Sequence, residues 1–138
     1  MSGLKVGVTR AIEGLRKHFA TTTVDVWPSA NGAAFVIVAD VPLGPPYAQE
    51  STWVGFFLST ACPDDDVYPF YVRGDLSRLD GTPLKTPLHI NRAFPEVSSD
   101  VPVRSAVMVS RRQNNPASLV YESPTLKLIT VLQWMLKQ

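Results

Sequence analysis

The residues best suited to chemistry lie together between Val103 and Asn115. The first part of this stretch is apolar, and its β-branched residues Val107 and Val109 favour a short strand. Arginines can hold a partner, or clamp their own loop, through paired hydrogen bonds. Many strands end in polar residues. A dense polar cluster directly after a short strand is, however, also typical of the floor of a functional site. The cluster consists of two arginines and three amides: Arg111, Arg112, Gln113, Asn114 and Asn115.

The single cysteine is a weaker candidate for chemistry. Cys62 lies before Pro63 and an acidic run from Asp64 to Asp66. Neighbouring carboxylates raise the pKa of a thiol, so Cys62 is predicted to be a poor thiolate nucleophile. The acidic run is interpreted as a solvated turn, because it lacks the ligand spacing of a metal site. One cysteine also excludes an internal disulfide framework and a cysteine-based zinc cluster.

The composition is that of one globular domain, which we place at residues 1–138. Apolar residues make up 45% of the chain and charged residues 18%, which is enough apolar material for a core. The net charge of +1 gives no strong field toward nucleic acid or an anionic membrane. No apolar run reaches the roughly 18 residues that span a bilayer, and the N-terminus lacks the pattern of a signal peptide. We therefore expect a soluble, cytoplasmic protein with no nucleic-acid or membrane partner.

Periodicity predicts a helix followed by strands in the first half of the chain. Apolar residues recur every three or four positions over residues 2–19, with Ser2 available as the N-terminal cap. Strands are predicted at 24–27, 35–41, 53–60 and 67–73. The second of these is apolar enough to be buried on both faces. Pro69 makes the fourth an edge strand or a kinked one. Asn31-Gly32 predicts a turn with positive φ.

The second half of the chain contains one long connection and one clear helix. From Gly74 to Pro102 the prolines leave no convincing element, and connections of this length are usually functional or mobile. Ser123 and Pro124 then form a cap and a first helical residue. The apolar stripe of this helix is expected in the core: Leu128, Val131, Leu132 and Met135. A helix, antiparallel strands and a second helix predict an α+β fold.

The order of these elements resembles the fold of ubiquitin-conjugating enzymes. In that family a Pro-Tyr loop joins the second and third strands, and a Tyr-Pro-Phe motif follows the third. This chain has Gly44-Pro45-Pro46-Tyr47 and then Tyr68-Pro69-Phe70. The resemblance implies an N-terminal helix, a four-stranded antiparallel meander, a long active-site loop and a C-terminal helix.

The second half is closer to a bacterial branch of the family, found in ubiquitin-like conjugation operons linked to phage defence. Eukaryotic members have His-Pro-Asn before the active cysteine, whereas this chain has His89-Ile90-Asn91 and no later cysteine. The bacterial branch carries its cysteine shortly before a Val-Ser-Arg-Arg segment, and an apolar helix with a tryptophan follows. Aligning Val109-Ser110-Arg111-Arg112 with that segment places the cysteine position at Ala106.

The chemistry of the family assigns roles around this position. A conjugating enzyme holds the C-terminus of a ubiquitin-like modifier as a cysteine thioester and passes it to an amine of a protein target. This needs a thiolate and a donor that stabilises the oxyanion. The resemblance implies that Asn114 or Asn91 supplies the donor, and that His89 supports the loop or transfers a proton. The residues expected to contact the modifier are Arg111, Arg112 and Ser110.

Each of these residues also has a structural interpretation. Asparagines form turns, arginines clamp loops or keep a surface soluble, and a histidine forms structural hydrogen bonds. The further partner that the resemblance implies is an ATP-dependent activating enzyme. It implies no metal and no organic cofactor.

Ala106 leaves the activity open, because a methyl group cannot form a thioester. Either the cysteine has been replaced, or the chain is a natural inactive relative that binds a ubiquitin-like protein as a scaffold. We favour replacement, since the polar residues around Ala106 are those that the chemistry needs. A third interpretation drops the resemblance and keeps an unrelated α+β protein-interaction domain.

Overall fold

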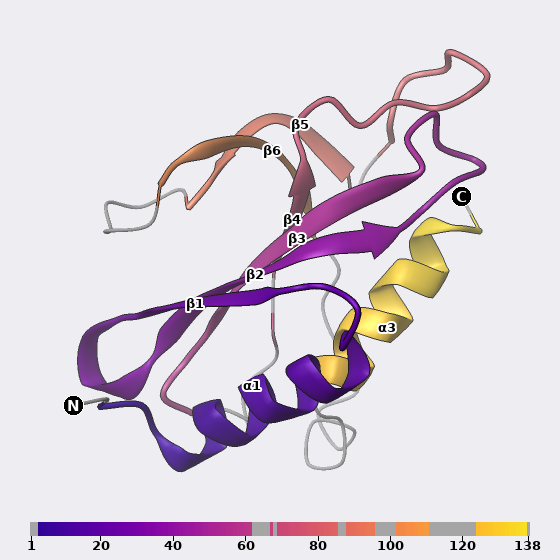
Figure 1. Ribbon diagram of the computed structural model, residues 1–138. Coiled ribbons are helices and arrows are strands. Elements are labelled where there is room, and N and C mark those ends of the chain that lie inside the picture. Colours follow the sequence, from indigo (N-terminus) through magenta and orange to yellow (C-terminus); the bar gives the residue numbers. More distant parts are fainter. Residues whose placement is uncertain are drawn as a thin grey trace.

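The computed structural model describes residues 3–61, 67, 69–85, 88–95, 102–110 and 124–137. These residues form an α+β fold in which two helices lie on one side of a six-stranded antiparallel sheet (Figure 1). The elements in chain order are α1 (Val6–His18), β1 (Val24–Pro28), η1 (Ala30–Gly32), β2 (Ala34–Pro42), β3 (Ser51–Leu58), β4 (Phe70–Arg73), β5 (Leu88–Phe94), β6 (Arg104–Val109) and α3 (Pro124–Met135).

The sheet has the strand order β1-β2-β3-β4-β6-β5, and every neighbouring pair is antiparallel. Its first four strands form the predicted meander, but the prediction of four strands was wrong. The two additional strands are β6, which pairs with β4, and β5, which pairs with β6 at the edge. The turn predicted at Asn31-Gly32 is confirmed, with φ values of 62° and 89°.

The strand β5 lies inside the 74–102 connection, where no element was predicted. It escaped prediction because its three middle residues, Ile90 to Arg92, are all exposed and two of them are polar, so it lacks the apolar alternation of a half-buried strand. A bulge between His89 and Arg92, with Asn91 at a φ of 61°, also breaks its register. Only its two ends, Leu88 and Phe94, are buried.

The predicted fourth strand is an interior strand rather than an edge strand. β4 pairs with β3 on one side and with β6 on the other. Pro69 does not interrupt it, because β4 begins at Phe70 and the missing N–H of the proline therefore lies outside the ladder. Phe70 is 1% exposed and packs edge-on against Phe56, with ring centroids 5.1 Å apart.

The first helix covers the sheet with the face that its periodicity predicted. Val8, Ile12 and Leu15 are buried in the main core. The helix begins at Val6, and Lys5 at its N-cap makes no side-chain capping bond; the predicted cap, Ser2, lies outside the described residues. At Gly14 an added Cβ would lie 3.3 Å from the hydroxyl of Thr125, so this glycine lets α1 approach α3 closely.

The second helix, α3, closes the same core from the C-terminal end. Leu128, Val131 and Met135 are buried as predicted, and Leu132 packs partly buried against them. Tyr47 donates a hydrogen bond of 2.9 Å from its hydroxyl to the Met135 carbonyl, which fastens the β2–β3 loop to this helix. Burial raises the pKa of this tyrosine. Among the described residues, no helix is long and apolar enough to cross a membrane.

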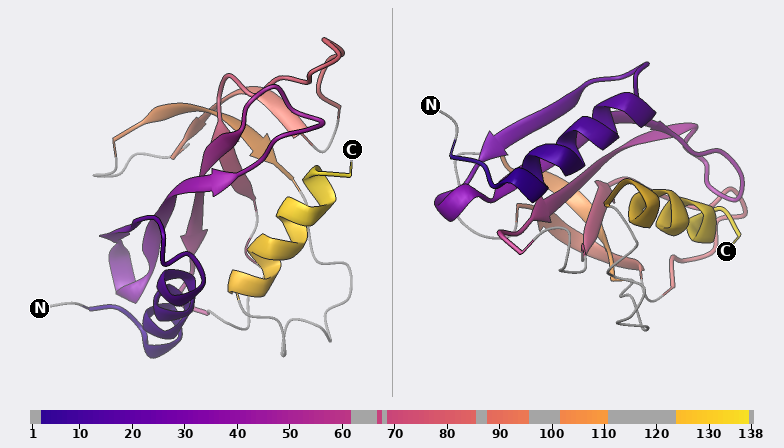
Figure 2. Two further views of the ribbon diagram at one scale, coloured as in Figure 1. Left: turned by 45° about the vertical axis from the view of Figure 1, so that its right-hand side comes forward. Right: turned by 90° about the horizontal axis from the view of Figure 1, so that it is seen from below.

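The other face of the sheet holds a second, aromatic core. No described helix covers this face, since both helices lie on the opposite side of the sheet (Figure 2). Phe94 from β5 reaches across the sheet and lies over Gly55 of β3, where an added Cβ would be only 2.7 Å from the ring. The ring centroids of Tyr71 and Phe35 lie 5.1 and 6.0 Å from that of Phe94. The buried members of this second core are Phe35, Ile37, Tyr71, Phe94 and Ala106.

We expect Gly55→Ala to destabilise the protein by about 1–3 kcal/mol, because the new methyl group overlaps a ring that its neighbours hold in place. Chemical denaturation measures the loss. Gly3→Ala is the matched control, since nothing lies within 4 Å of its added Cβ. Equal stability of the two variants would contradict the close packing of Phe94 on β3.

Candidate functional site

Ala106, the predicted cysteine position, lies within the sheet. It is in the middle of β6, opposite Arg73 of β4 and Arg92 of β5. Its methyl group belongs to the aromatic core and is 1% exposed. A thioester needs an accessible thiolate, and burial in an apolar cluster disfavours both access and ionisation. The short strand that the β-branched residues favoured is present as β6, and the Ala106 side chain faces the core.

The other described candidates lie around this position but not at one point. Asn91 is exposed in the β5 bulge, one residue from the partner of Ala106. His89 is half-buried opposite Met108, and Ser110 is half-buried just after β6. The remaining predicted site residues, together with Cys62, lie outside the described residues: Asn114, Arg111 and Arg112.

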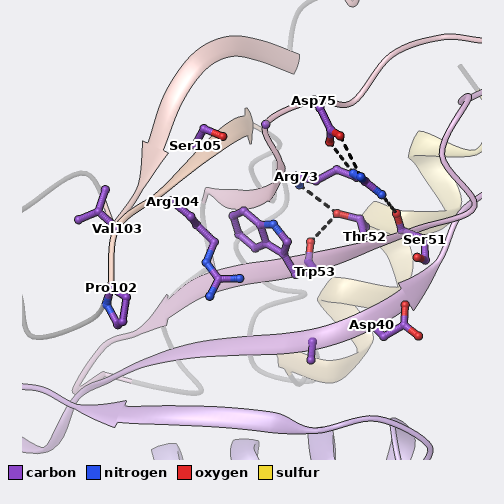
Figure 3. A pocket seen from close by; sticks show the side chains of 12 residues that line it. Asp40, Ser51, Thr52, Trp53, Arg73, Asp75, Pro102, Val103, Arg104 and Ser105 are labelled. Carbon is purple, nitrogen blue, oxygen red and sulfur yellow. Dashed lines mark hydrogen bonds and ion pairs between the residues drawn. The ribbon is translucent and has the colours of Figure 1, made fainter.

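The described part of the structure does contain a cleft beside Ala106. It has a volume of about 700 Å³ and lies where β2, β3, β4 and the start of β6 meet (Figure 3). The cleft exists because the ladder opens on both sides of β3. A register shift between Val38 and Val41 takes Ala39 and Asp40 out of the β2–β3 pairing. On the other side, the β3–β4 pairing is limited to two residue pairs.

The hydroxyl of Thr52 holds the opened strands together. It accepts a 3.0 Å hydrogen bond from the backbone N–H of Arg73 and donates one of 2.6 Å to the carbonyl of Trp53. Thr52 is 3% exposed, so these bonds replace ladder bonds away from water. The Thr52 side chain therefore supplies a hydrogen bond between β3 and β4 that backbone groups supply elsewhere in the sheet.

An ion pair forms one wall of the cleft. The guanidinium of Arg73 donates from Nε and Nη2 to the two carboxylate oxygens of Asp75, the second at 2.9 Å. Its Nη1 donates to the carbonyl of Ser51 at 3.0 Å, which links β4 to β3. The hydrogen bond to Arg73 lowers the pKa of Asp75, and the same bond raises the pKa of the guanidinium. The guanidinium of Arg73 is therefore bound both to Asp75 and to the backbone of β3.

The opposite wall is formed by Arg104 and Trp53. The guanidinium carbon of Arg104 lies 4.9 Å from the centroid of the indole ring, which is the geometry of a cation–π contact. In Figure 3 the Arg104 side chain runs alongside Trp53, and the carboxylate of Asp40 lies apart from it. The cleft thus combines a stacked guanidinium, an aromatic wall, the carboxylate of Asp40 and the hydroxyl-bearing residue Ser51, whereas the Ser105 side chain points away from Arg104 in Figure 3.

Sequence reasoning did not select Trp53, Arg104 or Asp40. The strand period places Trp53 on the same face as Gly55, but it does not reveal that Arg104 lies beside that face. Their proximity depends on the pairing of β6 with β4, two strands that are far apart along the chain. Within the described residues, no three His, Cys, Asp or Glu side chains gather as metal ligands.

Comparison with known proteins adds no relative, since no family model, curated protein or solved structure matches this chain.

Thr52→Val is expected to cost about 1–3 kcal/mol, because it leaves the buried N–H of Arg73 without its acceptor. Thr52→Ser retains the hydroxyl and serves as the control. Thermal and chemical denaturation measure both variants. If the valine and serine variants were equally stable, the hydroxyl bridge would not hold the two strands.

The Arg73–Asp75 pair predicts a small, pH-dependent contribution to stability. The Asp75 side chain is 65% exposed, so a double-mutant cycle with Arg73→Gln and Asp75→Asn should give at most about 1 kcal/mol at pH 7. Because the native pKa is lowered, this coupling is fully present above the ordinary carboxyl value of 3.8. It should disappear as the pH falls through the lowered native pKa. A coupling energy that rises in acid would contradict this assignment.

Proposed function

We propose that this chain is a ubiquitin-conjugating-type module that binds a ubiquitin-like protein without carrying it as a thioester. The observation that carries the proposal is the residue at the cysteine position. Ala106 has no nucleophile, and its side chain is part of a core rather than part of an exposed site. Binding is the part of the family's activity that requires no thiol.

The arrangement of the first half of the chain supports the family assignment. A helix precedes an antiparallel meander of β1 to β4, in the order that the resemblance implies. Two residues of the motifs that carry the resemblance are structural anchors. Tyr47 is 1% exposed and bound to α3, and Phe70 is 1% exposed where β4 begins. Residues that hold a fold together are consistent with a shared fold, whatever the activity.

The setting that we propose is a bacterial ubiquitin-like conjugation pathway, with the modifier as the direct partner. The activating enzyme and a protein target are partners of the pathway's reactions. In this setting a module without a thiol can hold the modifier near a reactive enzyme. The alternative is a conjugating enzyme whose cysteine has been replaced by Ala106.

A binding and charging experiment separates these functions. The isotope-labelled modifier is titrated with the unaltered chain and followed by NMR, while charging is assayed with activating enzyme and ATP. The chains tested are the unaltered one, Ala106→Cys and Cys62→Ser. We expect specific shifts in the modifier and no thiol-sensitive adduct with any of the three chains.

Each other outcome has one meaning. A reducible adduct formed only by Ala106→Cys would establish the conjugating enzyme and overturn the binding module. An adduct lost in Cys62→Ser would place the reactive thiol at Cys62. If the chain neither bound the modifier nor became charged, the proposed function would be wrong, and an unrelated protein-interaction domain would be the remaining interpretation.

A further inference from the structure

The cleft between β3 and β6 has a simple charge balance. Its lining contains two arginines and two aspartates: Arg73, Arg104, Asp40 and Asp75. Arg73 and Asp75 neutralise each other through the paired hydrogen bonds described above. The ionic groups left for a ligand are therefore one guanidinium and one carboxylate, on Arg104 and Asp40.

This balance selects the kind of ligand. A polyanion such as a nucleotide or nucleic acid needs several cations, and the two lining carboxylates would repel it. A ligand with one anionic group and one cationic group matches the two remaining charges. The free carboxylate of a peptide terminus, with a basic side chain a few residues before it, has this pattern.

The anionic end of such a ligand is suited to Arg104. A guanidinium binds a carboxylate through two parallel hydrogen bonds, and it can do so while its face is stacked on an aromatic ring. The stacking on Trp53 holds the Arg104 side chain in place before a ligand arrives, which reduces the entropy lost on binding. The side chain of Ser51 lines the same cleft, and its hydroxyl can bond to peptide groups.

The shape of the cleft also suits a chain terminus. Its volume of about 700 Å³ is in the range of ligand-binding clefts. Its walls are strand ends from β2, β3, β4 and β6, so an extended segment can lie along them. Thr52 and Arg73 brace these strand ends through the bonds that cross from β3 to β4, so the walls are already in place without a ligand.

We infer that this cleft binds the C-terminal end of a peptide, with its free carboxylate at Arg104, its body against Trp53 and a basic side chain at Asp40. The binding is non-covalent and goes beyond the proposed function. The terminus can belong to the ubiquitin-like modifier or to another protein. If the terminus is that of the modifier, the inference rests on the proposed function.

The first test uses three N-acetylated pentapeptides that end in leucine. Each carries one arginine, which is the second, third or fourth residue when the C-terminal leucine is counted as the first. Each is made as the free acid and as the C-terminal amide, and binding is measured by calorimetry and tryptophan fluorescence. We expect at least one acid to bind, and its amide to bind at least about tenfold more weakly. Trp53→Phe should remove the fluorescence change.

Matched variants locate the site. Arg104→Gln should weaken the acid at least about tenfold, whereas Arg10→Gln, an exposed arginine on α1, should leave it unchanged. Asp40→Asn should weaken the arginine peptide but not a glycine analogue of it. Equal affinity for acid and amide, no effect of Arg104→Gln, or no binding by any of the acids would each overturn the inference.

A second arm identifies the source and separates this inference from the proposed function. The modifier is titrated intact and without its last two residues, against the unaltered chain and Arg104→Gln. Loss of affinity with both changes would assign the cleft to the modifier's tail, whereas loss with the truncation alone would place the tail at another site. If neither change affected the affinity for the modifier, the proposed function would be upheld, and the modifier's tail would be excluded as the ligand of the cleft. Carboxylate-dependent peptide binding without modifier binding would uphold the cleft and overturn the proposed function.

Discussion

The second half of this sheet depends on the contact between Phe94 and Gly55. The ring lies so close to the β3 backbone that a single methyl group at residue 55 would overlap it. Phe94 stands at one end of an edge strand whose middle is exposed, so its burial helps to attach β5 to the rest of the molecule, together with Leu88 at the other end. Because β6 lies between β4 and β5, the same contact keeps the β6 segment against the aromatic core.

The position of Ala106 follows from this arrangement. Its side chain points toward the face that Phe94 covers, so the residue aligned with a catalytic cysteine becomes a small member of a core. A methyl group suits that place, since a larger side chain would have to displace aromatic rings in a well-packed cluster. Burial therefore gives a physical reason for an alanine here that does not involve chemistry.

The cleft beside Ala106 shows how an irregular sheet makes a site. Regular ladders pair every residue of neighbouring strands, whereas here a bulge interrupts the β2–β3 pairing and the Thr52 hydroxyl takes the place of a ladder bond between β3 and β4. The charged residues then differ in availability. Arg73 is fully engaged in holding the opening, while Arg104 is held by an aromatic face that leaves its hydrogen-bonding edge free to act.

The local pattern of the sequence was sufficient for the helices and the first strands. Apolar spacing of three and four marked the buried face of α1 and α3, and apolar runs marked β2 and β3, because these signals arise within one segment. It was insufficient for β5, whose exposed middle and positive-φ asparagine carry no strand signal. It predicted β4 to be an edge strand or a kinked one and did not reveal its interior position, since strand order is decided by pairing between distant segments.

The chemical identity of residue 106 was likewise readable without a structure: a methyl group forms no thioester. Its burial was not readable, and neither was the cleft that unites Trp53 with Arg104. Both depend on which strand lies beside which, and therefore on packing between residues that are far apart along the chain.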